Sequence, residues 1–247
     1  IASCLVGSEM CIRDRNIPVL YKQNTSNDLF QLIYVFDMGN NNDKVLGTAF
    51  DYIDYLGTSD MTPEQLKSEF YRLACTFRVV PGNERTYVLL SGLNENMPEA
   101  MKLFEKLMAD AQVNKEAYTN MVADILKSRK DAKLNQMQNF RRLMSYGMYG
   151  PKSPATNILT EAELQNMDPQ ELIDRIHNQN SYQHRILYYG PTSEKELLAI
   201  INKNHQAPKK LKEIPVGNEF PRLETPVTQI FICLLYTSDA ADDRISV

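Results

Sequence analysis

Residues 37–79 read DMGNNNDKVLGTAFDYIDYLGTSDMTPEQLKSEFYRLACTFRV, and this stretch decides the fold class. Asp43 has a side chain typical of a helix N-cap, and Gly57 predicts the end of the helix that Asp43 opens. Thr62, which a proline and a glutamate follow, predicts the start of a second helix. The β-branched and aromatic run that begins at Thr76 predicts a strand. Two helices therefore precede a strand.

On both sides of this stretch, the sequence predicts paired strands followed by consecutive helices, rather than strands and helices in alternation. The first two strands are expected to pair as one hairpin, and a turn at Pro81-Gly82-Asn83 predicts a second hairpin. This order predicts an α+β fold, an antiparallel sheet with helices packed on one face, and it excludes the alternating pattern of a nucleotide-binding sheet. Strands are expected at residues 17–22, 29–38, 76–80, 85–93 and 185–189, and helices at residues 43–56, 62–73, 97–111, 115–134, 135–146, 161–167, 169–178 and 193–204.

The composition is that of a folded, water-soluble chain. The 247 residues are 43% hydrophobic and 23% charged, with a formal net charge of −4. No apolar run reaches the roughly 18 residues of a membrane span, so no span is expected. The mildly acidic balance gives no electrostatic footprint for nucleic acid. Thirteen Tyr, nine Phe and eleven Met exclude an intrinsically disordered chain.

Both ends of the chain resemble translated sequencing adaptor. The DNA ATGTGTATAAGAGACAG encodes Met10–Asp14, and its reverse complement, read from the second base, encodes residues 233–237. Residues 1–15 and 233–247 are therefore interpreted as adaptor-derived scars on a truncated fragment from a metagenomic library, and no packing partners are expected for them. Cys4, Cys11 and Cys233 lie in these ends. A four-cysteine metal or disulfide framework is thereby excluded.

Residues 16–206 are expected to form one α+β domain. Residues 207–226 carry four prolines with charges between them, which is typical of an interdomain linker. Residues 227–232 are expected to be the first strand of a truncated next domain. Because the natural start of the protein is interpreted as missing, the sequence assigns neither a leader nor a compartment.

Several segments, in this order, resemble one domain of the insulinase/pitrilysin metallopeptidase family. They are residues 37–79, then YVLLSGLNENMPEAMKLFEKLM, then SYGMYGPKSPATNILTEAELQNMDPQELIDRI, and finally the strand of RILYYGP. The resemblance covers about residues 19–205. It implies one domain of a four-domain clamshell that encloses peptides and hydrolyses them with zinc, and it is compatible with a bacterial periplasm.

The family's zinc motif HxxEH lies on the first helix, just before a Gly-Thr that matches Gly57 and the residue after it. Aligned there, the motif positions hold Thr48, Asp51 and Tyr52, and the family's later glutamate ligand falls near Asp124. No histidine is present, and two carboxylates without imidazole make a poor zinc site. The resemblance therefore implies the non-catalytic third domain, without catalytic residues, metal or cofactor of its own. Zinc would belong to the catalytic half of the parent.

The remaining candidates have no ligand or nucleophile pattern. Cys75 ends an apolar helix and is expected to be a buried small hydrophobe. The histidines lack metal-ligand spacing and are expected to be exposed or locally hydrogen-bonded: His177, His184 and His205.

Two functions are compatible with these observations. The first is the non-catalytic half of a zinc metalloendopeptidase, which helps to enclose and bind peptide substrates for a missing N-terminal half. Its partners would be that half, a fourth domain and the peptides, and the substrate-binding residues are not assigned. The second is a binding or scaffold protein of the same fold, like inactive processing-peptidase relatives. An HxxEH encoded upstream favours the first. An enzyme that acts through Asp51 and Asp124 is a third, weaker reading.

Overall fold

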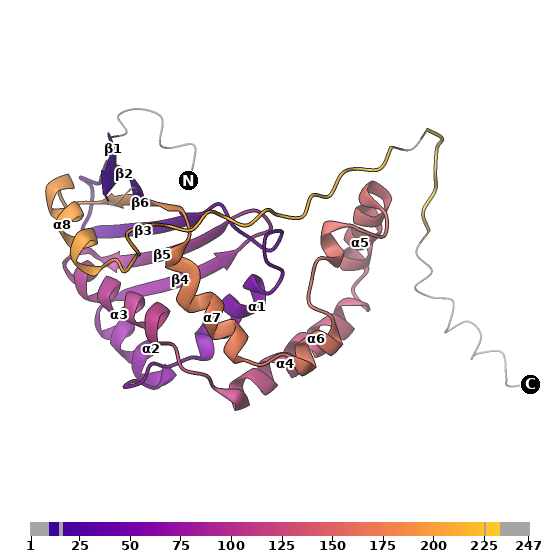
Figure 1. The fold of residues 1–247 in the computed structure, drawn as a ribbon, viewed down its shortest axis with the longest axis horizontal. Coiled ribbons are helices and arrows are strands. Elements are labelled where there is room, and N and C mark those ends of the chain that lie inside the picture. The colour runs from indigo at the N-terminus through magenta and orange to yellow at the C-terminus, as the bar shows by residue number, and fades with distance from the viewer. Residues whose placement is uncertain (1–9, 15–16, 225, 233–247) are drawn as a thin grey trace, which may run out of the picture. The chain divides into compact units, whose positions relative to one another are not determined.

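The computed structural model describes residues 10–14, 17–224 and 226–232, and the chain divides into two compact units (Figure 1). The first unit comprises Ile1–Met121 and Leu159–Asn218, and the second comprises Val122–Ile158 and Glu219–Val247. The single domain expected at residues 16–206 is thus interrupted by a segment that belongs to the second unit. None of the described helices is long and apolar enough to cross a membrane.

The first unit is built on a six-stranded sheet of order β1-β2-β6-β3-β5-β4. Pairing is antiparallel throughout except between β2 and β6, which are parallel. The predicted hairpin of the first two native strands is therefore wrong, because β6 lies between them and makes the sheet mixed. The strands are β1 Met10–Asp14, β2 Ile17–Gln23, β3 Leu29–Phe36, β4 Cys75–Pro81, β5 Thr86–Leu93 and β6 His184–Gly190.

Helices cover one face of this sheet, which confirms the α+β class; Figure 1 shows α1, α2, α3 and α7 on the same side. In the first unit the helices are α1 Leu46–Tyr52, α2 Pro63–Arg72, α3 Met97–Asp110, α6 Glu161–Asn166, α7 Gln170–Asn178 and α8 Glu194–Asn204. Helix α4, Lys115–Ala132, crosses the unit boundary, and α5, Gln136–Tyr149, lies in the second unit.

The helix expected at residues 43–56 is shorter than predicted. It consists of α1 followed by a 3₁₀ turn, η2 Ile53–Tyr55. Asp43 does not cap it. The Asp43 carboxylate instead accepts a hydrogen bond from the amide of Val45 at 2.9 Å and pairs with Arg175 at 3.1 Å. Asp43 therefore fixes the turn before the helix.

The core lies between the sheet and α3. On the central strand β3, alternate side chains at Phe30, Leu32, Tyr34 and Phe36 are at most 1% exposed, as expected for the covered face of a sheet. The rings of Tyr34 and Phe104 stack at 6.3 Å, which joins β3 to α3. Burial of these large side chains is the main source of the unit's stability.

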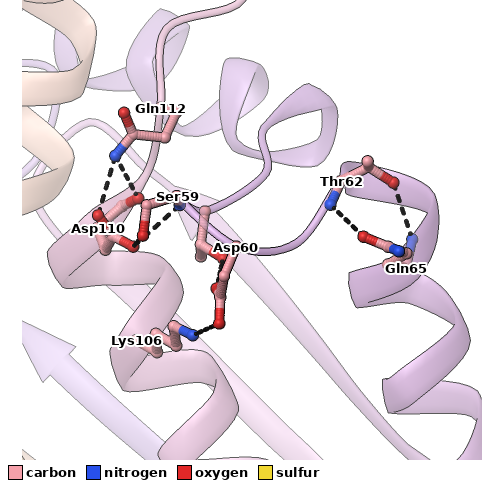
Figure 2. A network of polar contacts seen from close by, with 8 residues as sticks. Ser59, Asp60, Thr62, Gln65, Lys106, Asp110 and Gln112 are labelled. Carbon is pink, nitrogen blue, oxygen red and sulfur yellow. Dashed lines mark hydrogen bonds and ion pairs between the residues drawn. The ribbon is translucent and has the colours of Figure 1, made fainter.

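The loop between η2 and α2 is fixed to α3 by polar contacts (Figure 2). The Ser59 amide and hydroxyl both donate to the Asp110 carboxylate, at 3.0 and 2.6 Å, and Lys106 pairs with Asp60. At the end of this loop Thr62 and Gln65 form a reciprocal capping box, which confirms the predicted start of α2. The loop between η2 and α2 is therefore anchored at both ends.

Two predictions for the chain ends are wrong within the described residues. Met10–Asp14 does have a partner, since it pairs antiparallel with β2. The edge of β2 offers unpaired amides and carbonyls, and an extended segment of almost any sequence can pair with them. Residues 227–232 form no strand; the Phe231 ring packs on Tyr146 at 5.7 Å within the second unit. The rest of both adaptor-like ends lies outside the described residues.

The expected linker is irregular, but its first half is held on the first unit. Lys212 exchanges backbone hydrogen bonds with Ser181 and Gln183, at 2.7 and 3.0 Å. Farther along, the Asn218 amide donates to the Asn41 carbonyl at 2.7 Å. The boundary between the units falls directly after this last contact.

Candidate functional site

The positions aligned with the zinc motif lie on α1 and do not fit a metal. Tyr52 is fully buried, and its hydroxyl donates to the Asn114 carbonyl at 2.6 Å and accepts from the Asn114 amide at 2.8 Å. The Tyr52 hydroxyl oxygen thus bonds to the backbone of Asn114, the residue directly before α4, and is not available to a metal ion. Thr48 is half-buried, and Asp51 is exposed. Partial desolvation and then the charge of Asp54 raise the pKa of the Asp51 carboxyl, which weakens it further as a ligand.

Asp124, the fourth aligned position, is exposed on α4 in the part that belongs to the second unit. In the parts of the chain that the structure describes, no three His, Cys, Asp or Glu side chains are grouped so as to hold a metal ion. The residue types at the aligned positions also lack the imidazole nitrogen that zinc favours. The chemistry of the motif is therefore absent from these residues.

Beside α1 an apolar groove of about 650 Å³ opens between α2 and the edge strand β4. Its lining includes Leu66 and Phe70 of α2, Cys75 and Phe77 of β4, and Leu107 of α3. Cys75 is 2% exposed and burial raises the pKa of its thiol, so it is a packing residue, as expected, and not a nucleophile. The groove can accept an apolar side chain.

The backbone of β4 is open along this groove. Among the described strands, β4 lies at the edge of the sheet and pairs only with β5, in a register that joins Thr76 to Ser91. The amide of Leu93 donates to the Ala74 carbonyl at 3.3 Å. Because antiparallel ladders alternate, the amides and carbonyls of residues 75, 77 and 79 point away from β5. An extended peptide could therefore pair with β4 and place a side chain in the groove.

A buried polar cluster that the sequence did not predict lies elsewhere in the first unit. His184 Nε2 and His205 Nε2 are 2.9 Å apart, and His205 Nδ1 is 2.6 Å from Glu105 Oε1. Glu105 also accepts from the Tyr34 hydroxyl at 3.1 Å and from Asn180 Nδ2 at 2.9 Å. Both histidines were expected to be exposed or locally bonded; they are buried and bonded across the fold, whereas His177 is exposed.

Burial sets the protonation of this cluster. Desolvation and then the charge of His205 lower the pKa of His184 to about 4, against a smaller opposing effect of its bond to the Tyr182 carbonyl. Burial, followed by the charge of Glu105 and the hydrogen bond to it, raises the pKa of Tyr34 well above its ordinary value. At neutral pH, His184 and Tyr34 are therefore both uncharged.

Next to the cluster, the Gln179 side chain is fully buried, and neither its Nε2 nor its Oε1 has a hydrogen-bond partner in the described part of the chain. An unsatisfied buried amide costs about 1–3 kcal/mol. Gln179→Met is therefore expected to raise the free energy of unfolding by an amount in this range, measured by urea denaturation. The matched substitution at the exposed Gln170 should leave stability within about 0.5 kcal/mol. Destabilisation by Gln179→Met would show that the amide has a partner.

Comparison with known proteins shows the fold. No protein-family model matches the chain, and no curated protein sequence matches it. Among solved structures, the periplasmic protease PqqL from Escherichia coli matches with a TM-score of 0.72 at 13% identity, over 88% of this chain and 26% of that one. The peptidase M16 inactive domain from Pseudomonas fluorescens matches with a TM-score of 0.67 at 13% identity, over 85% of this chain and 54% of that one.

A third match is the ferredoxin protease FusC, in a complex with Arabidopsis ferredoxin, with a TM-score of 0.71 at 11% identity over 84% of this chain. The chain spans 23% of FusC, about a quarter of PqqL and about half of the inactive domain. The insulinase-like α+β fold predicted from the sequence is thus confirmed as the fold of M16 peptidase domains.

Proposed function

We propose that the chain is part of the non-catalytic half of an insulinase/pitrilysin-type zinc metalloendopeptidase and that it binds extended peptide without cleaving it. The open edge of β4 beside an apolar groove is the observation that carries this proposal. Strand addition supplies backbone hydrogen bonds that do not depend on sequence, and the groove supplies selectivity for an apolar side chain. Such a surface suits a protein that handles unfolded peptides.

Two further observations support the proposal. The structural matches include two proteases and an inactive peptidase domain, and the chain spans only a part of each. At the positions of α1 that align with the HxxEH zinc motif, Tyr52 is hydrogen-bonded to backbone and Asp51 is exposed. Under this proposal catalysis and zinc belong to a separate half of the parent protein, which would be the principal partner of this chain.

The test is peptide binding to a variant that closes the strand edge. A fluorescent, unstructured peptide with apolar side chains at alternate positions is titrated with the chain, and its anisotropy is measured. Val79→Pro removes an amide that points away from β5, so the sheet keeps its own ladder but loses a donor to the peptide. The affinity is expected to fall at least about tenfold, from the lost hydrogen bond and the steric conflict of the ring.

Val79→Ala is the matched control, because it shortens the side chain but retains the amide. Its affinity should stay within about threefold of the parent chain, and circular dichroism should show both variants folded. Equal affinities for Val79→Pro and the parent chain would contradict peptide binding at this edge.

A further inference from the structure

We propose that His184, His205 and Glu105 form a proton-operated latch, which holds the start of the linker on the first unit at neutral pH and releases it in mildly acidic solution. The same carboxylate serves the histidines and the linker. Glu105 Oε1 contacts His205, and Glu105 Oε2 accepts the backbone amide of Gln206 at 3.1 Å. Any rearrangement of the His205–Glu105 contact therefore acts directly on Gln206, the residue that immediately precedes the linker.

The hydrogen-bond pattern fixes how many protons the cluster holds. Glu105 accepts four donors, two on each oxygen, so it is a carboxylate and His205 Nδ1 carries a proton. His184 Nδ1 lies 2.7 Å from the Tyr182 carbonyl, which can only accept, so this nitrogen is protonated as well. One more proton lies between the two facing Nε2 atoms. The histidine pair thus carries a single positive charge, which Glu105 balances.

A fourth proton on the histidine pair, which would give it a second positive charge, cannot be accommodated in this geometry. Two N–H groups would face each other across the 2.9 Å between His184 Nε2 and His205 Nε2, and two positive charges would share a buried site. The pair must then separate. His184 sits within the ladder of β6, between neighbouring strands, whereas His205 lies just past the end of α8, where its backbone amide donates to the Ile201 carbonyl at 2.8 Å. His205 is therefore the group expected to move, together with Gln206.

The charges around His184 favour this response. His184 faces His205, which directly follows α8, and beyond it Glu105 of α3. From β3 it faces the uncharged Tyr34, at 6.4 Å between ring centroids. The linker side adds Lys209 and Lys210, which line a pocket of about 410 Å³ together with His184.

The one acid in that pocket offers little compensation. Asp37 is already paired with Arg185 at 2.5 Å and with Arg85 at 2.8 Å. The hydrogen bonds and charges of the two arginines lower the pKa of Asp37, against an opposing effect of desolvation. Since Asp37 stays paired in mild acid, no carboxylate among the described residues that line this pocket is free to neutralise a second positive charge on the histidines.

The difference between the pKa of His184 in the latched and released states sets how strongly acid favours release. The pKa of His184 is lowered to about 4 in the latched state, compared with 6.5 for a free histidine. Protonation therefore favours the released state, and acidification from pH 7.5 to pH 5.0 should raise the released fraction by up to about 25-fold.

The test is amide hydrogen exchange of the full chain, followed by mass spectrometry between pH 7.5 and pH 5.0 and corrected for the intrinsic pH dependence of exchange. The amides of Gln206, Lys212 and Asn218 donate to Glu105, Ser181 and Asn41. Their protection is expected to fall by at least about tenfold on acidification, towards the 25-fold limit. Protection in β3 should fall much less, because release is local.

His184→Gln is the decisive variant, since the amide can donate to Tyr182 and accept from His205 but does not titrate. In this variant the protection of the linker should be independent of pH. His177→Gln, which changes the exposed histidine on α7, should behave like the parent chain. The latch is refuted if linker protection in the parent chain does not change with pH. It is also refuted if β3 loses protection in parallel, or if His184→Gln keeps the full pH response.

Discussion

Glu105→Ala is expected to lower the free energy of unfolding by roughly 3–5 kcal/mol, the cost of breaking a buried ion pair on one side. The Glu105 side chain is 1% exposed, and the substitution leaves the His205 charge without its carboxylate. It also leaves the Tyr34 hydroxyl, the Asn180 amide and the Gln206 backbone amide without an acceptor. Urea denaturation at pH 7.5 measures the change.

Glu99→Ala provides the control on the same helix. Glu99 is exposed, and its pair with Arg72 at 3.5 Å is a surface contact, so its removal should change stability by no more than about 0.5 kcal/mol. If Glu105→Ala costs no more than Glu99→Ala, then Glu105 does not hold the cluster together.

Acidification from pH 7 to pH 5.5 is expected to lower the free energy of unfolding by about 1 kcal/mol through His184 alone. The folded protein favours the neutral form of His184, whose pKa is lowered to about 4. Between pH 6.5 and pH 4 the unfolded chain therefore binds this proton more readily than the folded protein does. The free energy of unfolding is unaffected by His184 above a pH of about 6.5 and decreases as the pH falls towards 4. Urea denaturation at several pH values measures this slope.

His184→Gln separates this effect from the carboxylates. The pKa values of Asp37, Asp60 and Asp110 are lowered from an ordinary value near 4, so these groups weaken the fold only in stronger acid. The variant should therefore have a flatter stability profile between pH 7 and pH 5.5. An unchanged slope in the variant would show that His184 is not the titrating group.

The sequence predicted those parts of the fold that depend on neighbouring residues. The start of α2 after the N-cap Thr62 and the β4–β5 hairpin are set by side chains and turn residues within a few positions of each other, and both are confirmed. The β2–β3 hairpin was wrong because β6, far along the chain, inserts between these strands. Such non-local pairing leaves no trace in the spacing of either strand.

The histidine cluster was missed for the same reason. His184, His205 and Glu105 come from three distant segments, and no short motif joins them. One signal was present, however. Glu105 falls on the apolar side of α3, next to Phe104 and four residues after Met101, where an acid is expected only if it has a buried partner. The zinc positions were easier to assess, since the absence of histidine is visible in the sequence.

The most direct test of the proposed function is native mass spectrometry of the chain, mixed with the apolar test peptide and an equivalent of zinc. We expect a complex of the chain with intact peptide and no zinc bound to the chain, because Thr48, Asp51 and Tyr52 lack the imidazole ligands that zinc favours. A zinc-bound chain that is lost in Asp51→Ala, accompanied by peptide fragments, would contradict the account.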